Sequence, residues 1–464
     1  MEKGYKKQII IICICVFLLI GMIVWGVVKN NPNLSNGISA NTITELKYSS
    51  ISKTASEISS EYENISYGTS TDFTGTKAVN ITSGGSYTLS GSYDSVTINT
   101  TESVELKLSN VEINSSNGPA INVENAKNVS IVLTGTNNIT STTTEDLDGA
   151  IYSKDDLVFS GTGTLEITSN YDGIVSKDKL IIISETYIIN SDDDGIRGKD
   201  IVAIKDGTFT IKAGGDGIKA TNDQDASKGY ITIDGGKFNI TSSNDAIDAI
   251  TEVAIFGGDF TIKATSTSDT YSAHGIKGGT GLLITGGTFN VNATGDGLHT
   301  DGNIKIDNGN FTITNKDDAI HADGFIEISN GTFEISAAEG IEATYIKIND
   351  GTINISASDD GINAGNKSDE YSATIEINGG NITITMGQGD TDGIDTNGNI
   401  YINGGKISIT GNSTFDYDGT ADLNGGTLIL NGSESNTIPN QMMGGGMNGD
   451  MNGGQQGGRG QMMR

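Results

Sequence analysis

A three-part unit that recurs along the chain is the feature that most restricts its fold. The unit has the form D-G-I-x-A, I-x-I-x-G-G, x-F-x-I and returns at intervals of about 22 residues from residue 148 onward. Its first part occurs eleven times, as DGAI (148), DGIV (172), DGIR (194), DGIK (216), DAID (245), HGIK (274), DGLH (296), DAIH (318), EGIE (339), DGIN (360) and DGID (392). Each part alternates apolar with polar residues, which predicts three short β-strands separated by Gly, Asp and Asn turns. One unit of this size cannot bury its own apolar face, so neighbouring units are expected to stack.

The large apolar residue of the third part forms one column, through Phe209, Phe238, Phe260, Phe289, Phe311, Phe333, Ile353, Ile382, Ile407 and Leu428. The longer steps contain insertions at 222–230, 265–271 and 365–372, which we interpret as surface loops on a regular frame. Leucine-rich repeats and nonapeptide calcium β-rolls have different patterns, and the absence of Pro from 120 to 438 suits central strands. The sequence therefore predicts an all-β fold, a right-handed parallel β-helix with three strands and about 22 residues per coil.

The ends of the chain differ from the repeat. Residues 9–28 are uninterrupted by charge and follow three lysines, and about 20 such residues cross a bilayer as one helix. We expect a cytoplasmic tip and transmembrane anchor over 1–29, which makes this a single-pass protein of the cell membrane with an extracellular C-terminal domain; a cleaved signal peptide is the alternative. A polar stalk is expected over 30–61, the β-helix over 62–436 and a disordered Gly/Met/Gln-rich tail over 437–464.

The composition narrows the classes of partner. The formal net charge of −30 argues against nucleic acid, and we expect a monomer. Both cysteines, Cys13 and Cys15, lie in the hydrophobic segment, so disulfides, thiol catalysis and Cys-ligated zinc are excluded from the repeat region. A surface this acidic either binds cations or only favours solubility, and the arrangement of the carboxylates has to decide.

Stacked coils place equivalent residues about 4.8 Å apart, so the Asp of each D-G-I becomes a column of carboxylates on one edge. Calcium takes six to eight oxygen ligands of this kind. The candidate metal ligands in or beside this turn are Asp172, Asp192, Asp193, Asp194, Asp216, Asp245, Asp248, Asp296, Asp317, Asp318, Asp359 and Asp360. Asp is also common in turns for structural reasons, which explains one Asp per coil but not the run DDD at 192–194 or the two DD pairs. We therefore expect calcium as a cofactor.

The outward residue of the first strand changes along the repeat, through Val175, Arg197, Lys219, Asp248, Lys277, His299, His321, Glu342, Asn363 and Asp395. This variety fits a graded binding face and equally a solvated face. The candidate substrate-binding residues are Arg197, Lys219, Lys277, His299 and His321 from this row and Tyr230, Tyr271 and Tyr371 from the inserted loops. Tyrosine rings either stack on sugars or pin the loops that carry them.

Two histidines of this row occupy adjacent coils. His299 precedes Asp301 in HTDG, and His321 precedes Asp323 in HADG. Imidazole and carboxylate groups at this spacing suit a transition metal, and they also suit a plain surface ladder. Both interpretations stay open at this point.

The stretch GSYTLSGSYDSVTINTTESVELKLSNVEINSSNGPAINVENAKNVSIVLTGTNNIT (85–140), the repeated D-G-I and I-x-I-x-G-G units and the Gly/Met/Gln tail together resemble the clostridial carbohydrate-binding β-helix family. The resemblance runs over about residues 62–436. It implies a pectate-lyase-like fold, calcium binding, and the binding of acidic plant polysaccharide and cellulose.

The resemblance also suggests a place for the metal. In polysaccharide lyase family 9, calcium is held by an Asp from one coil and a D-D-x-x-D run from the next. Here Asp216, followed by Asn244, Asp245 and Asp248, is similar, and Lys277 one coil on is a weak candidate for the general base. Asn244 breaks the run and two insertions alter the local register, which argues for binding without catalysis.

The expected function is therefore that of a cell-surface carbohydrate-binding protein, without enzyme activity, that recognises acidic polysaccharide of the pectin or polygalacturonate type, and cellulose as a further candidate, with calcium. Two alternatives remain, a calcium-dependent pectate lyase and a structural or adhesive surface rod without a sugar ligand.

Overall fold

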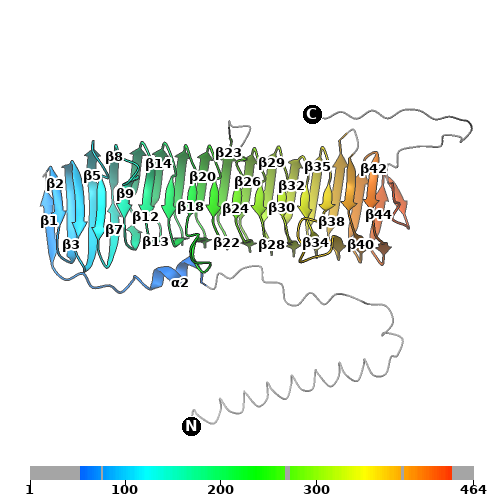
Figure 1. Ribbon diagram of the computed structural model, residues 1–464, viewed down its shortest axis with the longest axis horizontal. Coiled ribbons are helices and arrows are strands. Elements are labelled where there is room, and N and C mark those ends of the chain that lie inside the picture. The colour runs from blue at the N-terminus through cyan, green and yellow to red at the C-terminus, as the bar shows by residue number, and fades with distance from the viewer. Residues whose placement is uncertain (1–52, 75–76, 267–271, 388–390, 442–464) are drawn as a thin grey trace, which may run out of the picture. The chain divides into compact units, whose positions relative to one another are not determined.

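The computed structural model describes residues 53–74, 77–266, 272–387 and 391–441. In Figure 1 the strands stack side by side into a solenoid that runs from the blue N-terminal coils to the red C-terminal coils. Among the described strands, every pair but the last is parallel and joins equivalent strands of successive coils. The predicted all-β fold with stacked parallel strands is confirmed, and each regular coil contributes three strands.

The first strands of the coils form one 15-stranded sheet, here called the first ladder. Its members are β2 (Ala78–Ile81), β4 (Ser95–Asn99), β6 (Ile121–Asn125), β9 (Gly149–Ser153), β12 (Asp172–Ser176), β15 (Ile196–Gly198), β18 (Ile218–Ala220), β21 (Ile247–Ala249), β24 (Ile276–Gly278), β27 (Leu298–Thr300), β30 (Ile320–Ala322), β33 (Ile341–Ala343), β36 (Ile362–Ala364), β39 (Asp392–Thr396) and β42 (Ser413–Tyr417).

The second strands form the second ladder, which comprises β7 (Asn128–Thr134), β10 (Leu157–Gly161), β13 (Lys179–Ile182), β16 (Ile201–Ile204), β19 (Tyr230–Ile233), β22 (Glu252–Ile255), β25 (Gly281–Ile284), β28 (Asn303–Ile306), β31 (Phe325–Ile328), β34 (Tyr345–Ile348), β37 (Thr374–Ile377), β40 (Asn399–Ile402) and β43 (Ala421–Leu423). The third ladder comprises β8 (Thr136–Ser141), β11 (Thr164–Ser169), β14 (Thr186–Ser191), β17 (Thr208–Ala213), β20 (Lys237–Ser242), β23 (Asp259–Ala264), β26 (Thr288–Ala293), β29 (Asn310–Asn315), β32 (Thr332–Ala337), β35 (Thr352–Ala357), β38 (Asn381–Met386), β41 (Lys406–Thr410) and β44 (Thr427–Leu430).

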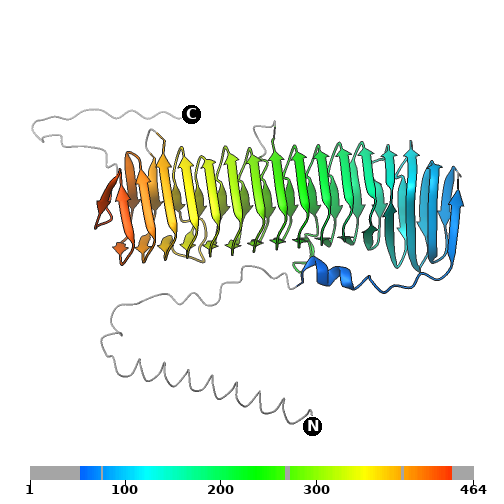
Figure 2. The same cartoon turned by 180° about the vertical axis from the view of Figure 1, so that it is seen from behind.

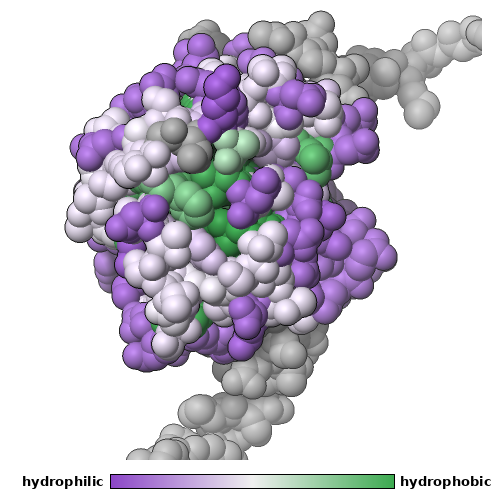
Figure 3. All heavy atoms as spheres, turned by 90° about the vertical axis from the view of Figure 1, so that its left-hand side faces the viewer, coloured by the Kyte–Doolittle hydropathy of each residue, from purple (hydrophilic) through white to green (hydrophobic). Residues whose placement is uncertain are grey.

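The second and third ladders merge at the N-terminal end. There β1 (Ser70–Thr74) pairs with β3 (Gly85–Tyr93), and β3 pairs with the long strand β5 (Ser103–Ser115). The first part of β5 pairs with β7 and its last part with β8, so one strand serves both ladders. Figure 3, which looks onto this end, shows apolar side chains at its centre inside a ring of hydrophilic ones, which is the core seen end-on.

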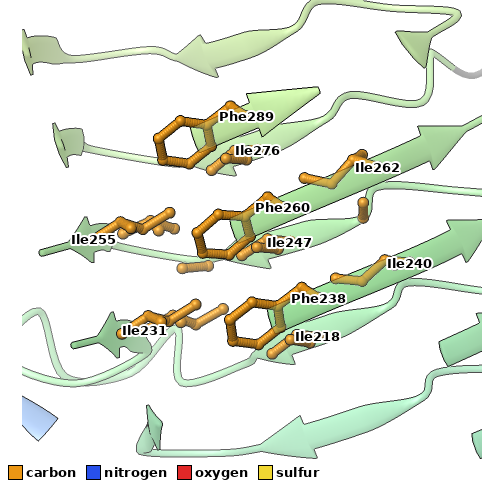
Figure 4. Close-up of a cluster of buried hydrophobic side chains, with 14 of the residues drawn as sticks. Ile218, Ile231, Phe238, Ile240, Ile247, Ile255, Phe260, Ile262, Ile276 and Phe289 are labelled. Carbon is orange, nitrogen blue, oxygen red and sulfur yellow. The ribbon is translucent and has the colours of Figure 1, made fainter. Parts of the chain in front are cut away.

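The core is built from columns of identical side chains. The predicted Phe column is confirmed, since Phe209, Phe238 and Phe260 pair in register and their rings stack with centroids 4.7 and 4.6 Å apart. Figure 4 shows this column beside parallel columns of isoleucines from the other two ladders. Face-on stacking at the strand spacing lets each ring exclude water from both faces of its neighbour.

Two glycine positions in the unit have steric reasons. A Cβ on Gly195, the glycine of D-G-I, would lie 2.5 Å from the carbonyl oxygen of Gly217 in the next coil. Gly258, the second glycine of I-x-I-x-G-G, has φ +117°, which L side chains rarely adopt. The first glycine allows successive turns to stack closely, and the second allows the chain to turn the corner between the second and the third strand.

A short helix, α2 (Ala55–Ser60), lies on the flank of the solenoid, and Figure 2 shows the chain after it running back to the first coils. Its apolar side packs on Val158, Ile181 and Ala203 of the second ladder. The carboxylate of Asp234 accepts hydrogen bonds from the backbone N–H groups of Ala55 (2.9 Å) and Ser56 (2.7 Å). The last part of the expected stalk, 30–61, is therefore an ordered strap, and the regular strands begin at residue 70, not at 62.

The C-terminal end is closed by chain reversal. The strand β45 (Ser433–Ser435) pairs antiparallel with β44. Gln441 then caps β42, since its side-chain oxygen accepts a hydrogen bond from Thr414 N–H (2.6 Å) and its own N–H donates to Phe415 O (2.9 Å). Residues 437–441, expected to belong to the tail, thus cover the last coil and protect its open edge.

Within the described residues, no helix is long and apolar enough to cross a membrane. The predicted anchor over residues 9–28 lies outside the described residues.

Candidate functional site

The residues that open the first strands form a single file along the solenoid, as predicted. This inner column comprises Asp172, Asp194, Asp216, Asp245, His274, Asp296, Asp318, Glu339, Asp360 and Asp392. The Asp side chains from Asp172 to Asp318 are buried. Because buried carboxylates need partners, their hydrogen bonds explain how such a column folds.

Six carboxylates of the inner column, those of Asp172, Asp194, Asp216, Asp245, Asp296 and Asp360, accept a hydrogen bond from the backbone of the next coil. The Oδ1 of Asp172 accepts the N–H of Asp194 (2.9 Å), Asp194 Oδ1 accepts that of Asp216 (2.8 Å), and Asp216 Oδ1 accepts that of Asp245 (2.8 Å). The same bond recurs from Asp318 N–H to Asp296 Oδ1 (3.0 Å). In these six residues one carboxylate oxygen therefore stabilises the stacking of the coils, and the Oδ2 atom remains to face the outer residues.

One coil uses imidazole in place of carboxylate. His274 Nδ1 accepts the N–H of Asp296 at 2.9 Å, which requires a lone pair on Nδ1 and hence a neutral ring. Burial lowers the pKa of His274 to about 4, in agreement with this bond. His274 was not singled out as a site residue, although its place in HGIK, aligned with the D-G-I units, marks it as a member of the column.

The outward residues of the first strands form a second file beside the first. This outer column comprises Val175, Arg197, Lys219, Asp248, Lys277, His299, His321, Glu342, Asn363 and Asp395, and successive members pair in register. The predicted row is thereby confirmed as one continuous strip. Its members determine the charge that each inner carboxylate meets.

Near Arg197 the outer column supplies cations. A guanidinium nitrogen of Arg197 lies 2.5 Å from Asp172 Oδ2 and also contacts Asp148. Lys219 pairs with Asp216 and lies 3.9 Å from Asp194 Oδ2. Asp148 was not among the candidate residues, although its D-G-A-I motif places it at the start of the repeat.

Near Asp248 the outer column supplies a further carboxylate instead. Oxygen atoms of Asp216, Asp245 and Asp248 all lie within 4.8 Å of one another. Burial, followed by the charges of Asp216 and Asp245, raises the pKa of Asp248 to about 7, and burial raises that of Asp245 to about 6. Lys277 Nζ lies 3.6 Å from Asp245 Oδ2. The structure therefore brings together the group that the sequence suggested, despite the insertions around it.

Asn244 contributes to this group as a donor. Its Nδ2 donates a hydrogen bond of 2.7 Å to Asp216 Oδ1, which also accepts the N–H of Asp245. The residue that breaks the expected D-D-x-x-D run thus orients Asp216 and leaves its Oδ2 toward the outer column. Asp216 Oδ2, Asp245 Oδ2 and the Asp248 carboxylate form an oxygen-rich donor set that fits a hard cation such as calcium.

The next two coils carry histidine in the outer column. His299 Nδ1 lies 2.6 Å from Asp296 Oδ2, and His321 Nδ1 lies 2.8 Å from Asp318 Oδ2. The rings of His274, His299 and His321 stack, with centroids 4.4 and 5.1 Å apart. The imidazoles thus form a short stack in line with the Asp248 group.

The strip becomes acidic again toward the C-terminus. Asp318, Glu339 and Glu342 offer oxygen atoms within 4.8 Å of one another, and Lys367 Nζ lies 2.8 Å from Glu342 Oε1. Burial raises the pKa of Glu339 to about 8. Glu339 was not among the ligand candidates because it is not an Asp, although EGIE aligns with D-G-I.

Four predicted aspartates lie outside both columns. Asp192, Asp193, Asp317 and Asp359 are exposed residues that precede members of the inner column. Asp193 has an oxygen atom close to those of Asp172 and Asp194. Asp192, Asp317 and Asp359 belong to none of the close ligand groups found among the described residues.

The loop tyrosines lie away from this strip where they are described. Tyr230 opens β19 on the second ladder and packs against the α2 cluster. The ring of Tyr371 lies 5.9 Å from that of Phe325, so it pins its insertion to the second ladder. Tyr271 lies outside the described residues.

Comparisons with known proteins identify the family to which the chain is similar. A family model described as "Carbohydrate-binding domain-containing protein" matches residues 75–319 and 313–452. A solved structure described as the polysaccharide lyase-like protein from C. thermocellum, as a gadolinium derivative, is similar with 24% identity and a TM-score of 0.41, over 51% of this chain and 96% of that chain. No curated protein matches.

Proposed function

Because this chain belongs to the family of carbohydrate-binding domain-containing proteins, we propose that it binds acidic polysaccharide at the cell surface through calcium held by Asp216, Asp245 and Asp248. The ligand class we propose is a chain of uronic acids, of the pectin or polygalacturonate type, with cellulose as a further candidate. The solenoid is proposed to be a right-handed coil, in keeping with the strong preference of parallel crossovers for that hand.

The single observation that supports this assignment most strongly is the clustering of three carboxylates whose charge the protein leaves incompletely balanced. Among the described residues, the cations that pair with this group are Lys219, at Asp216, and Lys277, at Asp245. Calcium accepts carboxylate oxygens at 2.3–2.6 Å and completes six to eight positions with carbonyls, waters and ligand oxygens. Three carboxylates leave several of these positions for a uronate carboxylate.

The location of the group suits a linear polymer. Asp248 and its neighbours in the outer column lie at successive strand spacings along one line of the solenoid. A sugar chain that follows this line would pass Lys219 on one side of the calcium and Lys277 on the other, and both ammonium groups attract uronate carboxylates. Calcium would then bridge protein and polymer, and the lysines would add charge complementarity.

We also propose that the N-terminal hydrophobic segment holds the protein in the cell membrane, with the solenoid outside. A polymer ligand of the outer surface is consistent with this location, and calcium is supplied there.

The test is binding of the full chain to polygalacturonate, with and without a calcium chelator. Binding should disappear in the chelator and return with calcium. Asp248→Asn should weaken the calcium-dependent binding, while Asp259→Asn, which changes an exposed Asp on the third ladder, should leave it unchanged. Binding that persists in the chelator would contradict the calcium bridge.

A second candidate function is a calcium-dependent polysaccharide lyase, favoured by the position of Lys277 beside the carboxylate group. A neutral amine there could remove the proton next to a uronate carboxylate whose charge calcium offsets. Incubation with pectate and calcium would then release unsaturated, ultraviolet-absorbing products, and Lys277→Ala would abolish them. The wild-type chain yielding no such product across alkaline pH would leave binding as the function.

A further inference from the structure

The three histidines of the chain occupy successive coils of one strip. His274, His299 and His321 are all the histidines in 464 residues, and their rings stack on one another. This group is one coil removed from Asp248, and it offers nitrogen where that group offers only oxygen. A different class of ligand is therefore expected here.

Each of the two outer-column rings has a buried carboxylate behind it. Asp296 Oδ2 lies 2.6 Å from His299 Nδ1, and Asp318 Oδ2 lies 2.8 Å from His321 Nδ1. A carboxylate at this position accepts a hydrogen bond from Nδ1–H, which fixes the tautomer whose Nε2 carries the lone pair for a metal ion. Histidines that bind metals usually have their second nitrogen held in this way. Asp296 is itself held, since its Oδ1 accepts the N–H of Asp318 at 3.0 Å.

Each ring also has a carboxylate in front of it. His299 Nε2 lies 3.4 Å from Asp301 Oδ1, and His321 Nε2 lies 3.4 Å from Asp323 Oδ1. An ordinary N–H···O hydrogen bond is shorter, at about 2.7–3.2 Å. A tetrahedral ion about 2.0–2.1 Å from nitrogen and about 2.0–2.2 Å from oxygen separates its two ligand atoms by about 3.4 Å. Without a bound ion the His321 contact is a long hydrogen bond, and the spacing in both coils matches that of a chelating pair.

We propose that His299 with Asp301, and His321 with Asp323, bind first-row divalent transition metals such as Zn²⁺, one ion for each coil, independently of the calcium group. Imidazole nitrogen favours Zn²⁺, Cu²⁺ and Ni²⁺ over calcium. The two rings lie at 18° to each other with centroids 5.1 Å apart, so their Nε2 lone pairs run side by side and each meets its own ion. Two protein ligands for each ion leave positions open to solvent, because the side chains of Asp301 and Asp323 are 73% and 43% exposed.

His274 has a different role in the stack. Its Nδ1 already accepts the N–H of Asp296, as the Asp of other coils does, so it belongs to the inner column and not to the metal pair. This difference supplies a matched control, because His274→Asp restores the residue that the inner column carries in most coils.

The experiment is titration of the full chain with Zn²⁺ by calorimetry, with calcium present at millimolar concentration. The wild-type chain should bind up to two ions, and His274→Asp should bind the same number. Asp301→Asn with Asp323→Asn should weaken binding by about 10-fold or more, and His299→Gln with His321→Gln should abolish it. The circular dichroism of every variant should match that of the wild-type chain. The variant pair at the exposed Asp301 and the half-exposed Asp323 leaves the buried residues unchanged.

Two further readouts separate this proposal from unspecific binding. With Cu²⁺, the paramagnetic resonance spectrum should show nitrogen coupling that disappears in the double His variant and persists in His274→Asp. The proposal is wrong if Zn²⁺ binds the double His variant with wild-type affinity, if the folded wild-type chain does not bind Zn²⁺, or if calcium displaces it at equal concentration.

Discussion

The coils around Arg197 and around Asp248 have the same inner column but different outer residues. At both places a buried Asp accepts the N–H of the next coil and turns its second oxygen outward. At the first place that oxygen meets a guanidinium, and at the second it pairs with the Lys219 ammonium group while the outer column adds the carboxylate of Asp248 beside it. The inner column therefore stabilises the stacking of the coils. The outer residue determines whether the inner carboxylates are neutralised by an ion pair or gain a further carboxylate that favours a bound cation.

The largest effect is expected when the ion pair is broken. Arg197→Met leaves the buried Asp172 without its closest cation, and losing one partner of a buried pair costs about 3 kcal/mol or more. Thermal unfolding of the variant should show a clearly lower midpoint, whereas Lys199→Met, at the exposed position directly after β15, should not. Calcium should recover part of the loss in Arg197→Met alone, and an equal recovery in the control would contradict the comparison.

Replacing the outer carboxylate at Asp248 by a cation should remove the expected calcium site. Asp248→Lys replaces the third carboxylate by an ammonium group in line with Lys219, so calcium affinity should fall by about 100-fold or more, since changes to groups that only orient a ligand already cost 10–100-fold. Calorimetry with calcium measures this. In the absence of calcium, the free energy of unfolding of the variant should be at least that of the wild-type chain. Asp259→Lys serves as the exposed control.

The pH dependence of the unfolding free energy should differ between the calcium-free and the calcium-bound protein. Burial raises the pKa of both Asp172 and Asp248 to about 7, far above the values of an unfolded chain. Such groups bind protons more readily in the folded state, so the metal-free chain gains stability as pH falls from 8 to about 6.5, by about 0.8 kcal/mol for each group. His274, with its pKa lowered to about 4, opposes this gain mainly below about pH 6.5, where the unfolded ring takes up its proton.

Denaturant unfolding at pH 8 and pH 6.5 provides the measurement. Saturating calcium should remove the part of the pH dependence that comes from Asp248, because the cation replaces the proton. Stability that falls between pH 8 and 6.5 in the metal-free chain would be the opposite result.

The smallest effect is expected from the exposed member of an Asp pair. Asp359→Ala changes a solvated carboxylate and should alter the unfolding free energy by no more than about 0.5 kcal/mol. Asp360→Ala removes the acceptor of the Asp392 N–H, a bond of 2.9 Å, and should cost about 1–3 kcal/mol. An equal loss of unfolding free energy in the two variants would contradict a structural role for the Asp360 carboxylate that Asp359 lacks.

Sequence periodicity predicted the columns well because, in a solenoid, the spacing along the chain is also the register between strands. The Phe column and the outer column follow directly from aligned units, and the Asp216, Asp245 and Asp248 group follows from the first strand. Periodicity does not show which oxygen of an Asp faces inward. The hydrogen bonds from backbone N–H groups to the carboxylates of the preceding coil could therefore not be predicted from the sequence.

The strap and the end cap could not be derived from the repeat, since neither repeats. Asp234 and Ala55 meet across 179 positions of the sequence. A local signal for α2 did exist, because Thr54 and Glu57 form a capping box. The position of Tyr230 depends on that strap, so its ring could not be assigned to a flank before the helix was known.

The strap also determines how the solenoid would respond to tension. Going along the chain, contacts reach the coil of Asp234 first, then Asp156 through the hydroxyl of Tyr62 (2.6 Å), and only afterwards the first coil through β1. A pull on the chain at residue 53 therefore enters at the side of the solenoid and is carried first by the α2 contacts. Coils of a solenoid are lost most easily from an end, one neighbour contact at a time. Attachment at the flank therefore protects the terminal coil from being pulled off the end of the solenoid.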